Sequence, residues 1–509
     1  MPDQDQHPDE ILETATRWEQ PGSDQIGVEH IELGAAVAAG RGARASVFTL
    51  NVHDIRWWPV LIILIAVTGL IGYLIFQLRP TQPDKMQGQF NVAVSEFVVQ
   101  DENEDSVQSE DGRALANYLY QQIRTNFEEL ELQKIVPYDI WTPEYTGSIV
   151  GRTAAEREQA AEKKANDIGA HIIIYGVLIK NGKDSDLRPE FFVNHSSFQE
   201  AAEIVGQHEL GSRIRLKLPS TDQIPSIENP ALAGRVNAVS MITLGLAYYS
   251  IDDFENAIRY FEQAENENRW VSTAGKEIIY LLLGNSYVRL TSKGKAPQYL
   301  SQASIQYTKA LEINPDYGRA QVGLASVLFL LAQGNPSQTS INLAILKEAA
   351  QRLDEAAMLE NQPESANLET KIHFYQGMIY LAYHFAKLPE EEQLGLARNE
   401  FQQVIEDFET GDTRVKGVAS HAYARLGIIA GEQKDFDLAI EYLKKAIDQA
   451  SPYYEMEYNS WLANFYLVND QEDLAQKALE EAIAIAEANG DSESIKRYTD
   501  KLNDLLDSP

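Results

Sequence analysis

The longest uninterrupted hydrophobic run lies between Arg56 and Arg79, where residues 57–78 give 22 positions without a charged side chain. At about 1.5 Å rise per residue such a helix would be roughly 33 Å long and would cross a hydrocarbon core of about 30 Å. A buried core helix of this length would normally keep a polar stripe. A cleaved signal peptide would not start after 56 mostly polar residues. The pattern therefore predicts a retained transmembrane helix that contacts the lipid bilayer.

The basic residues beside this run predict its orientation. Arg41, Arg44 and Arg56 precede it, whereas Arg79 and Lys85 follow it. Positive residues are enriched in cytoplasmic segments, so three against two favours a cytoplasmic N-terminus. The sequence thus predicts a single-pass protein of the cell membrane whose C-terminal domains are extracytoplasmic.

The polar segments on either side of the run are expected to form no folded domain of their own. Residues 1–25 are acidic and have no sustained hydrophobic period, and residues 26–52 add only two short strand-like runs, at 26–31 and 46–50. Residues 1–56 are therefore expected to be a largely disordered acidic tail. Residues 79–88 contain proline and are expected to be a linker. Neither segment is large enough to bury a core of its own.

Residues 89–220 alternate between strand-like and helix-like patterns, which predicts a small α/β domain. One expected helix presents its hydrophobic residues at helical spacing, and Gly169 is expected to end another. The expected order is a strand at 90–99, a helix bearing Leu115, Leu119, Ile123, Phe127 and Leu130, a strand at 133–141, a helix at 153–168, and strands at 171–179, 191–193 and 214–218.

The strand at 90–97, the amphipathic helix after it and the strand at 169–176 resemble a known domain. They are similar to the small α/β domain in the N-terminal part of the translocation protein TolB and in curli-secretion and flagellar outer-membrane lipoproteins. The resemblance implies a binding role in the cell envelope.

From residue 236 to the end, after a second linker at 221–235, the pattern is helical and repeats itself. Leu-Gly-x-x-Tyr on one helix and Ala-x-x-x-Phe-x-x-Ala on the next are the spacings of a tetratricopeptide repeat, which this region resembles. The copies are marked by Gly245, Tyr248, Ala257 and Phe261; by Gly284, Tyr287, Ala303 and Tyr307; by Gly323, Ala349 and Leu353; by Gly377, Tyr380, Ala397 and Phe401; by Gly427, Ala439 and Leu443; and by Ala463, Tyr466, Ala475 and Leu479.

Six copies and a charged last helix at 492–506 predict an all-α solenoid that ends in a polar cap. The alternative is an unrelated helical bundle. The fold class expected for the whole chain is therefore multidomain, with a single transmembrane helix, a small α/β domain and a C-terminal all-α solenoid.

The resemblance implies that the first helices of the repeats line an inner surface that binds proteins or peptides. Some members of the family clamp a C-terminal carboxylate there with a set of Asn, Lys and Arg side chains, of which this chain has isolated members only. Each candidate could instead lie on a solvated face or between repeats. The candidates are Asn285 and Arg289 in the second repeat, Lys371 and Phe374 in the fourth, His421 in the fifth and Asn464 in the sixth.

Charge and composition exclude several functions. The net charge is −33, with 76 acidic against 43 basic residues, so the phosphate backbone of a nucleic acid would be repelled. The chain has no cysteine, which excludes disulfides, thiolate metal sites and a cysteine nucleophile.

Motifs for metal binding and catalysis are not recognisable in the sequence. Asp101, Asn103 and Asp105 match the start of a calcium loop, but Ser106 replaces the required glycine and Gly112 replaces the bidentate glutamate. No paired histidine motif, phosphate-binding loop or nucleophile elbow occurs. We therefore expect no enzyme activity, no cofactor and no metal.

Three functions remain open at this stage. The first is a membrane-anchored scaffold that binds partner proteins through the repeats, on the extracytoplasmic side. The second is a transmembrane sensor or regulator, in which the α/β domain captures a ligand and signals to the N-terminal tail. The third is a hydrolytic enzyme, which would need converging carboxylates in the α/β domain.

Overall fold

The structure is a computed structural model. It describes residues 85–100, 106–130, 132–181, 184–195, 204–211, 213–217, 229–270, 272–292, 298–333, 341–359, 367–387 and 393–506. Three features of the sequence analysis lie outside the described residues. They are the expected tail at 1–56, the expected transmembrane helix at 57–78, and residues 101–105, which match the start of a calcium loop. Pro83–Pro509 forms one compact unit.

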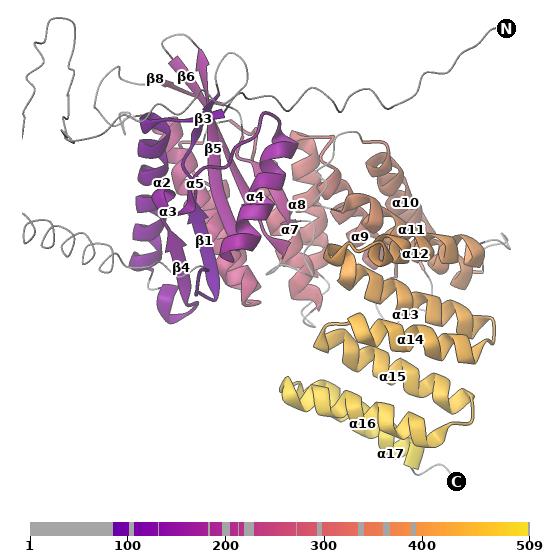
Figure 1. Ribbon diagram of the computed structural model, residues 1–509. Coiled ribbons are helices and arrows are strands. Elements are labelled where there is room, and N and C mark those ends of the chain that lie inside the picture. The colour runs from indigo at the N-terminus through magenta and orange to yellow at the C-terminus, as the bar shows by residue number, and fades with distance from the viewer. Residues whose placement is uncertain are drawn as a thin grey trace, which may run out of the picture. The chain divides into compact units, whose positions relative to one another are not determined.

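An α/β domain comes first in this unit (Figure 1). Its strands are β1 (Phe90–Val94), β2 (Val98–Gln100), β3 (Ser106–Gln108), β4 (Tyr138–Trp141), β5 (Ile172–Asn181), β6 (Asp184–Val193), β7 (Gly206–Glu209) and β8 (Ile214–Lys217). Its helices are α2 (Glu110–Glu129), α3 (Pro143–Thr146) and α4 (Ala154–Ile168), with a 3-10 turn at Leu132–Lys134. Gly169 ends α4 in the left-handed conformation, as the sequence predicts.

Strand β5 is the centre of one mixed sheet. It pairs in parallel with β1 and β2 on one side and antiparallel with β6 along its whole length on the other. Strands β3 and β4 extend the first side, whereas β7 and β8 both pair with β6. The nearly continuous hydrophobic character of β5 follows from this central place, because both faces of the strand are covered.

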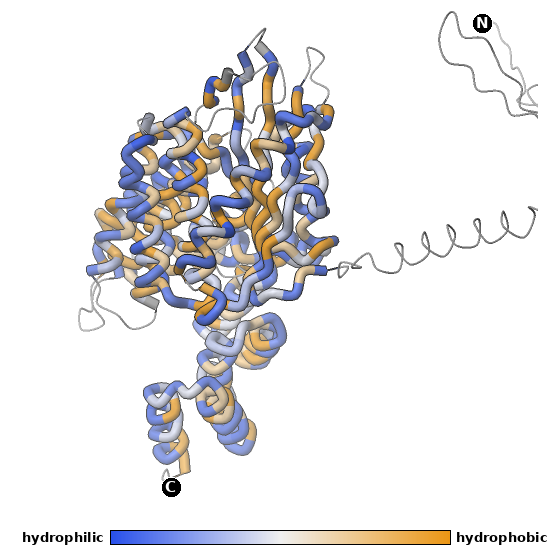
Figure 2. Tube along the Cα trace, turned by 90° about the vertical axis from the view of Figure 1, so that its left-hand side faces the viewer, coloured by the Kyte–Doolittle hydropathy of each residue, from blue (hydrophilic) through white to orange (hydrophobic). Residues whose placement is uncertain are grey.

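The sheet lies between two different layers. Val92, Val94 and Ile174 belong to the same hydrophobic core as α2, whereas Ala93 and Ile173 belong to a second core with α4. The alternation follows from the two-residue period of a strand, which sends neighbouring side chains to opposite faces. Figure 2 shows the hydrophobic positions along the long strands.

The single strand expected at 90–99 is in fact two strands. Strand β1 ends at Val94, directly before Ser95, and Glu96 forms an isolated parallel bridge with Ser148. The Glu96 carboxylate accepts a hydrogen bond from Arg113 Nε at 2.7 Å. This ion pair explains the break, because a carboxylate within a buried strand requires a partner that a strand neighbour does not supply. Strand β7 was not expected, because its four residues show no hydrophobic alternation.

The rest of the chain consists of antiparallel helix pairs. They are α5 (Pro230–Ser250) with α6 (Phe254–Glu265), α7 (Glu277–Ser292) with α8 (Gln298–Ile313), α9 (Gly318–Gln333) with α10 (Leu343–Ala357), α11 (Leu368–Phe385) with α12 (Gln393–Glu409), α13 (Lys416–Glu432) with α14 (Phe436–Gln449), and α15 (Pro452–Val468) with α16 (Glu472–Ala488). Helix α17 (Ser492–Leu506) follows the last pair.

The small residues of the expected repeats lie where the two helices of a pair meet. A Cβ atom on Gly245 would lie 2.3 Å from a ring carbon of Phe261, and one on Gly377 would lie 2.8 Å from Phe401. Such distances are impossible for non-bonded carbons, so glycine is required for the close approach. The ring of Tyr307 fills the equivalent space beside both Gly284 and Gly323.

Helix α5 starts earlier than expected. Residues 230–235 belong to the expected linker at 221–235, but they form the first turns of this helix. Asn229 is the N-cap, with its side chain accepting hydrogen bonds from two backbone N–H groups, and Pro230 occupies the first turn. An Asn-Pro pair is a helix start signal that the sequence analysis did not use.

Helix α5 is also long and hydrophobic enough to span a membrane, by length and composition, but 78% of its most hydrophobic window is buried inside the protein. Within the described residues it is the one helix that meets these criteria. A core helix fits the observation, since α5 packs against α2 and α6.

The α/β domain and the first repeats are not separate bodies. One hydrophobic core runs continuously from the sheet and α2 into the helices α5 to α11. Arg319 of α9, only 1% exposed, donates from Nη1 to the Val205 carbonyl at 2.5 Å and from Nη2 to the Gln207 carbonyl at 3.4 Å. A different core holds α12 to α16 together.

Candidate functional site

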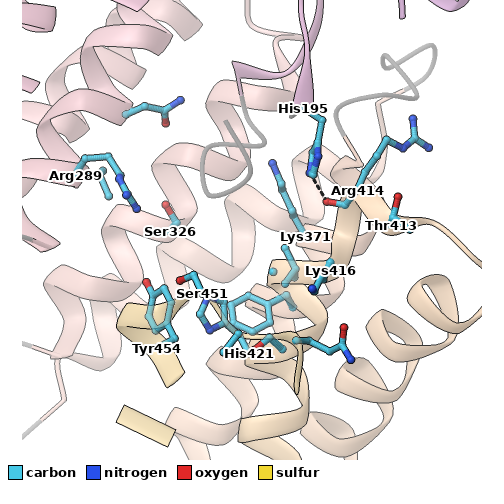
Figure 3. A pocket seen from close by; sticks show the side chains of 18 of the residues that line it. His195, Arg289, Ser326, Lys371, Thr413, Arg414, Lys416, His421, Ser451 and Tyr454 are labelled. Atoms are coloured by element: carbon cyan, nitrogen blue, oxygen red, sulfur yellow. Dashed lines mark hydrogen bonds between the residues drawn. The ribbon is translucent and has the colours of Figure 1, made fainter. Parts of the chain in front are cut away.

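A pocket of about 730 Å³ lies where the α/β domain meets the repeats (Figure 3). The α/β domain contributes α4 and the two residues after β6. The repeats contribute α5, α7, α8, α9, α11, α13 and α15, together with the last residue of α14 and the 3-10 turn at Thr413–Val415. A volume between about 300 and 1,000 Å³ is typical of a ligand site. Since first helices form most of the wall, the pocket occupies part of the inner surface that the sequence analysis expected.

The structure places five of the six candidate binding residues on the wall of this pocket. They are Asn285, Arg289, Lys371, Phe374 and His421. Asn464 lies exposed on α15, outside the pocket. The register of the repeats therefore brought together residues that are 136 positions apart in the chain, from 285 to 421.

Asn285 is held in place from one side only. Its Oδ1 accepts a hydrogen bond from the Tyr307 hydroxyl, and the residue is 6% exposed. Its Nδ2 has no hydrogen-bond partner among the described residues. A buried amide without a partner costs free energy, so this N–H group is poised to donate to an oxygen atom of a ligand.

Arg414 joins the α/β domain to the fifth repeat at the edge of the pocket. Its carbonyl lies 2.8 Å from Nε2 of His195, the contact drawn in Figure 3. Its guanidinium donates to both oxygens of Asp412 at 2.9 Å and lies 4.0 Å from Glu162 of α4. Burial raises the pKa of Asp412, but the Arg414 hydrogen bonds outweigh it and lower that pKa.

The two histidines of the pocket are in different surroundings. Burial lowers the pKa of His195, so this ring is neutral at pH 7. The ring of His421 contacts Tyr454 edge-on, with 4.2 Å between centroids, and its Nδ1 contacts the Tyr458 hydroxyl. Phe374 lies 6.0 Å from the His421 ring, so these side chains form an aromatic floor.

Several lining residues were not expected from the sequence. Glu162, Asn166, Asn194 and His195 come from the α/β domain, and no local pattern marks them. They reach the pocket through tertiary packing, which periodicity does not encode. Lys416, also missed, is more accessible to sequence reasoning, because it follows Arg414 closely at the start of a first helix in a strongly acidic chain.

The lining offers hydrogen bonds and charges but no evident reaction centre. Within the part of the chain that the structure describes, no group of three or more His, Asp or Glu side chains is placed to hold a metal ion. Glu162 is the one carboxylate among the described lining residues, so the paired carboxylates of the hydrolytic alternative are not present on this wall.

Comparison with known proteins identifies the repeats. A family model described as tetratricopeptide repeat matches residues 238–269 and 420–452. Neither match falls within residues 89–220, so the likeness to the TolB-type domain stays an expectation. No curated protein matches the chain.

Several solved structures of helical repeat proteins are similar to part of the chain. A chain of the APC/C heterotetramer Cut9–Hcn1 aligns with 53% of this chain at 17% identity and a TM-score of 0.39, and this chain spans 43% of that one. TTC0263, a tetratricopeptide protein of Thermus thermophilus, aligns at 16% identity over 45% of this chain and 99% of its own, with a TM-score of 0.33. PilF of Pseudomonas aeruginosa aligns at 14% identity over 53% and 99%, with a TM-score of 0.34.

The family matches fall on α5 to α6 and on α13 to α14, which are the first and fifth of the helix pairs. The same pairing and the same small-to-aromatic contacts recur between them. Two of the helix pairs therefore match the tetratricopeptide model, and the C-terminal part of this chain is a helical solenoid of the tetratricopeptide-like kind, preceded by a small α/β region.

Proposed function

We propose that this protein is a protein-interaction scaffold, and that it binds a partner polypeptide in the pocket between its α/β domain and its repeats. The observation that carries the proposal is the convergence of Asn285, Arg289, Lys371, Phe374 and His421 on one wall. Tetratricopeptide repeats use such inner surfaces to hold extended or helical segments of other proteins. The protein acts by binding and has no catalytic role.

The shape of the site limits what can be bound. A volume of about 730 Å³ accommodates a short stretch of chain but not a folded domain. The continuous core between the sheet and the helices α5 to α11 covers much of the inner surface of the first repeats. The partner would therefore insert a short segment into the pocket rather than a whole domain.

Site-specific photocrosslinking tests this proposal. A benzoylphenylalanine at position 374 replaces a pocket ring, and one at position 474 replaces Leu474, which is 44% exposed on α16. Irradiation of cells should give a discrete adduct from position 374 and none from position 474. Equal adducts from both positions, or no adduct from position 374, would contradict a binding role for the pocket.

The membrane setting is a second part of the proposal. The uncharged run at 57–78 would anchor the chain, and the excess of arginine before it would keep the N-terminus in the cytoplasm and place the α/β domain and repeats outside it. Fusion of the C-terminus to a phosphatase that is active only outside the cytoplasm should give enzyme activity. A cytoplasm-only fluorescent reporter should stay dark at the same position, and the opposite pair of results would reverse the orientation.

A further inference from the structure

Two histidines of the α/β domain lie directly against the repeats. His208 of β7 places its Nε2 3.0 Å from Nη1 of Arg319 in α9. His195 comes two residues after the end of β6, and its Nε2 lies 2.8 Å from the carbonyl oxygen of Arg414 (Figure 3). Strand β7 pairs with β6 up to the last residue of β6, so both histidines belong to the same end of the sheet. Each of them meets an arginine residue of the repeats there.

The ring of His208 lies in a closely packed place beside a positive charge. The residue is 4% exposed, and its ring stacks on that of Phe191 with 5.0 Å between centroids. Its Nε2 also lies 2.8 Å from the carbonyl oxygen of Ile204. The guanidinium of Arg319 is charged at every pH of interest. A second proton on the ring would therefore add a cation to a buried site that already holds one.

The other charges near β7 lie on the opposite face of the sheet. Side chains of a strand alternate between the two faces, and the neighbouring Gln207 donates to Glu190 on the face that α4 covers. The charged groups on that face are Arg157, Glu158, Glu190 and Glu209. Toward the repeats, Arg319 is the described charge that acts on His208, and the nearby Tyr317 is neutral because burial raises its pKa.

Closing the junction disfavours the charged form of both rings. Burial and the charge of Arg319 hold the pKa of His208 well below its usual value. Burial also lowers the pKa of His195; the Arg414 carbonyl and Asp412 favour its charged form, whereas the Arg414 guanidinium and Lys371 oppose it. In contact with water, each ring would regain an ordinary pKa of about 6.5. Opening of the junction is then coupled to proton uptake, so acid favours the open form.

We propose that His208 and His195 form an acid-sensitive latch between the α/β domain and the repeats. At neutral pH both rings are uncharged, and this end of the β6–β7 pair lies against α9 and Arg414. Below about pH 6.5 each ring takes up a proton, and this end separates from the repeats while the rest of the shared core stays closed. The inference goes beyond binding, because the latch is a property of the protein without a partner.

The latch would also act on the pocket. Asn194 and His195 line it, so their separation from the repeats would remove part of its wall. A bound segment should then be held less tightly in acid. This consequence rests on the proposed function, whereas the latch itself is tested without any partner.

Thiol labelling of a single cysteine measures the opening in the full-length chain. The chain has no cysteine, so Val205→Cys introduces one thiol, at a residue that is 1% exposed and whose carbonyl accepts from Arg319. A thiol reagent reaches this position only in the open form, so the labelling rate follows the opening equilibrium. Thiolate reactivity also changes with pH. Each rate is therefore divided by the rate of the same cysteine in a His208→Gln background, which cancels that change.

The ratio should rise about tenfold between pH 7.5 and pH 5.5, which is the factor for one group that titrates near pH 6.5 only when the junction is open. Division by the double variant His208→Gln/His195→Gln should give a larger rise, and an equal rise would remove His195 from the latch. The matched control is His384→Gln, at a half-buried histidine of α11. Division by the rate in that background should give a ratio that does not change with pH.

A second cysteine distinguishes local opening from unfolding of the whole chain. Val404→Cys lies at a fully buried position of α12, in the core that holds α12 to α16 together. His208→Gln should leave the pH dependence of its labelling unchanged. A ratio at position 205 that stays constant with pH, or an equal rise at positions 205 and 404, would overturn the latch. Neither result bears on the adduct from position 374, which tests the proposed function separately.

Discussion

Arg319 should hold the α/β domain against the repeats, and its removal should loosen that junction measurably. The guanidinium belongs to α9 and is almost fully buried, and it donates to the carbonyls of Val205 and Gln207 beside β7. Arg319→Met keeps the length and packing of the side chain but removes both donors. The carbonyl oxygens would then lie at the junction without these partners.

The size of the effect is worked out from the two bonds to carbonyl oxygens; Nη1 of Arg319 also lies 3.0 Å from Nε2 of His208. A buried acceptor that loses its donor costs about 1–3 kcal/mol, and the 2.5 Å bond to Val205 should contribute more than the 3.4 Å bond to Gln207. Burying methionine does not require a charge to be desolvated, as burying arginine does, and this difference offsets part of the free energy lost with the hydrogen bonds. We therefore expect a local destabilisation of about 2 kcal/mol, which corresponds to about a 30-fold increase in the equilibrium for opening.

Hydrogen exchange followed by mass spectrometry on the full-length chain measures this opening. Amides of β7 and of its neighbours should exchange about 30-fold faster in Arg319→Met, while those of α14 and α16 should not change. Arg352→Met is the matched control, since Arg352 forms a partly exposed pair with Glu355 on the surface of α10 and should shift exchange very little. Unchanged exchange at β7 would refute the reasoning that Arg319 couples the two parts.

Three further predictions concern the helix pairs and the sheet. In urea denaturation, Gly245→Ala should destabilise the first repeat by about 1–3 kcal/mol, because the added carbon would lie 2.3 Å from the facing ring. Gly395→Ala, with open space around it, should be neutral or stabilising. Equal effects of the two substitutions would contradict the packing argument. Arg157→Met should lower the free energy of unfolding by about 3–5 kcal/mol, because it leaves the buried carboxylate of Glu190 without its cation. Adding Glu190→Leu should restore most of that stability. No recovery in the double variant would argue against a desolvation effect. Burial lowers the pKa of His171 to about 4, so below about pH 6.5 the unfolded chain binds a proton that the folded chain does not. The free energy of unfolding should therefore fall by up to about 3 kcal/mol between pH 6.5 and 4. His171→Gln should reduce this dependence of stability on pH, and an unchanged dependence would show that His171 is not its cause.

Local patterns predicted the elements that depend on neighbours in sequence. The helix pairs follow from the spacing of small and bulky residues, since the ring of Phe261 can approach the first helix only where glycine, here Gly245, leaves the space. The hydrophobic run of β5 predicted a central strand because its residues are covered on both faces. Both signals are carried within a few tens of residues.

The parts that were missed depend on contacts between distant segments. The break between β1 and β2 follows from the pairing of Glu96 with Arg113 and its bridge to Ser148, which no hydrophobic period records. The fusion of the α/β domain with the repeats depends on Arg319, whose partners lie more than 100 positions away in the chain. The register of the repeats predicted the residues of one wall of the pocket. Glu162 and His195 on the other wall could be assigned to the pocket only from the tertiary structure.

The most direct test of a shared binding site is to crosslink the partner from both walls of the pocket. Photoreactive residues at position 166 of α4, in the α/β domain, and at position 416 of α13, in the repeats, both lie on the lining. Irradiation should attach the same partner from both positions and none from position 474 on α16. An adduct from position 416 alone, or different partners from the two positions, would show that the α/β domain and the repeats do not form one site.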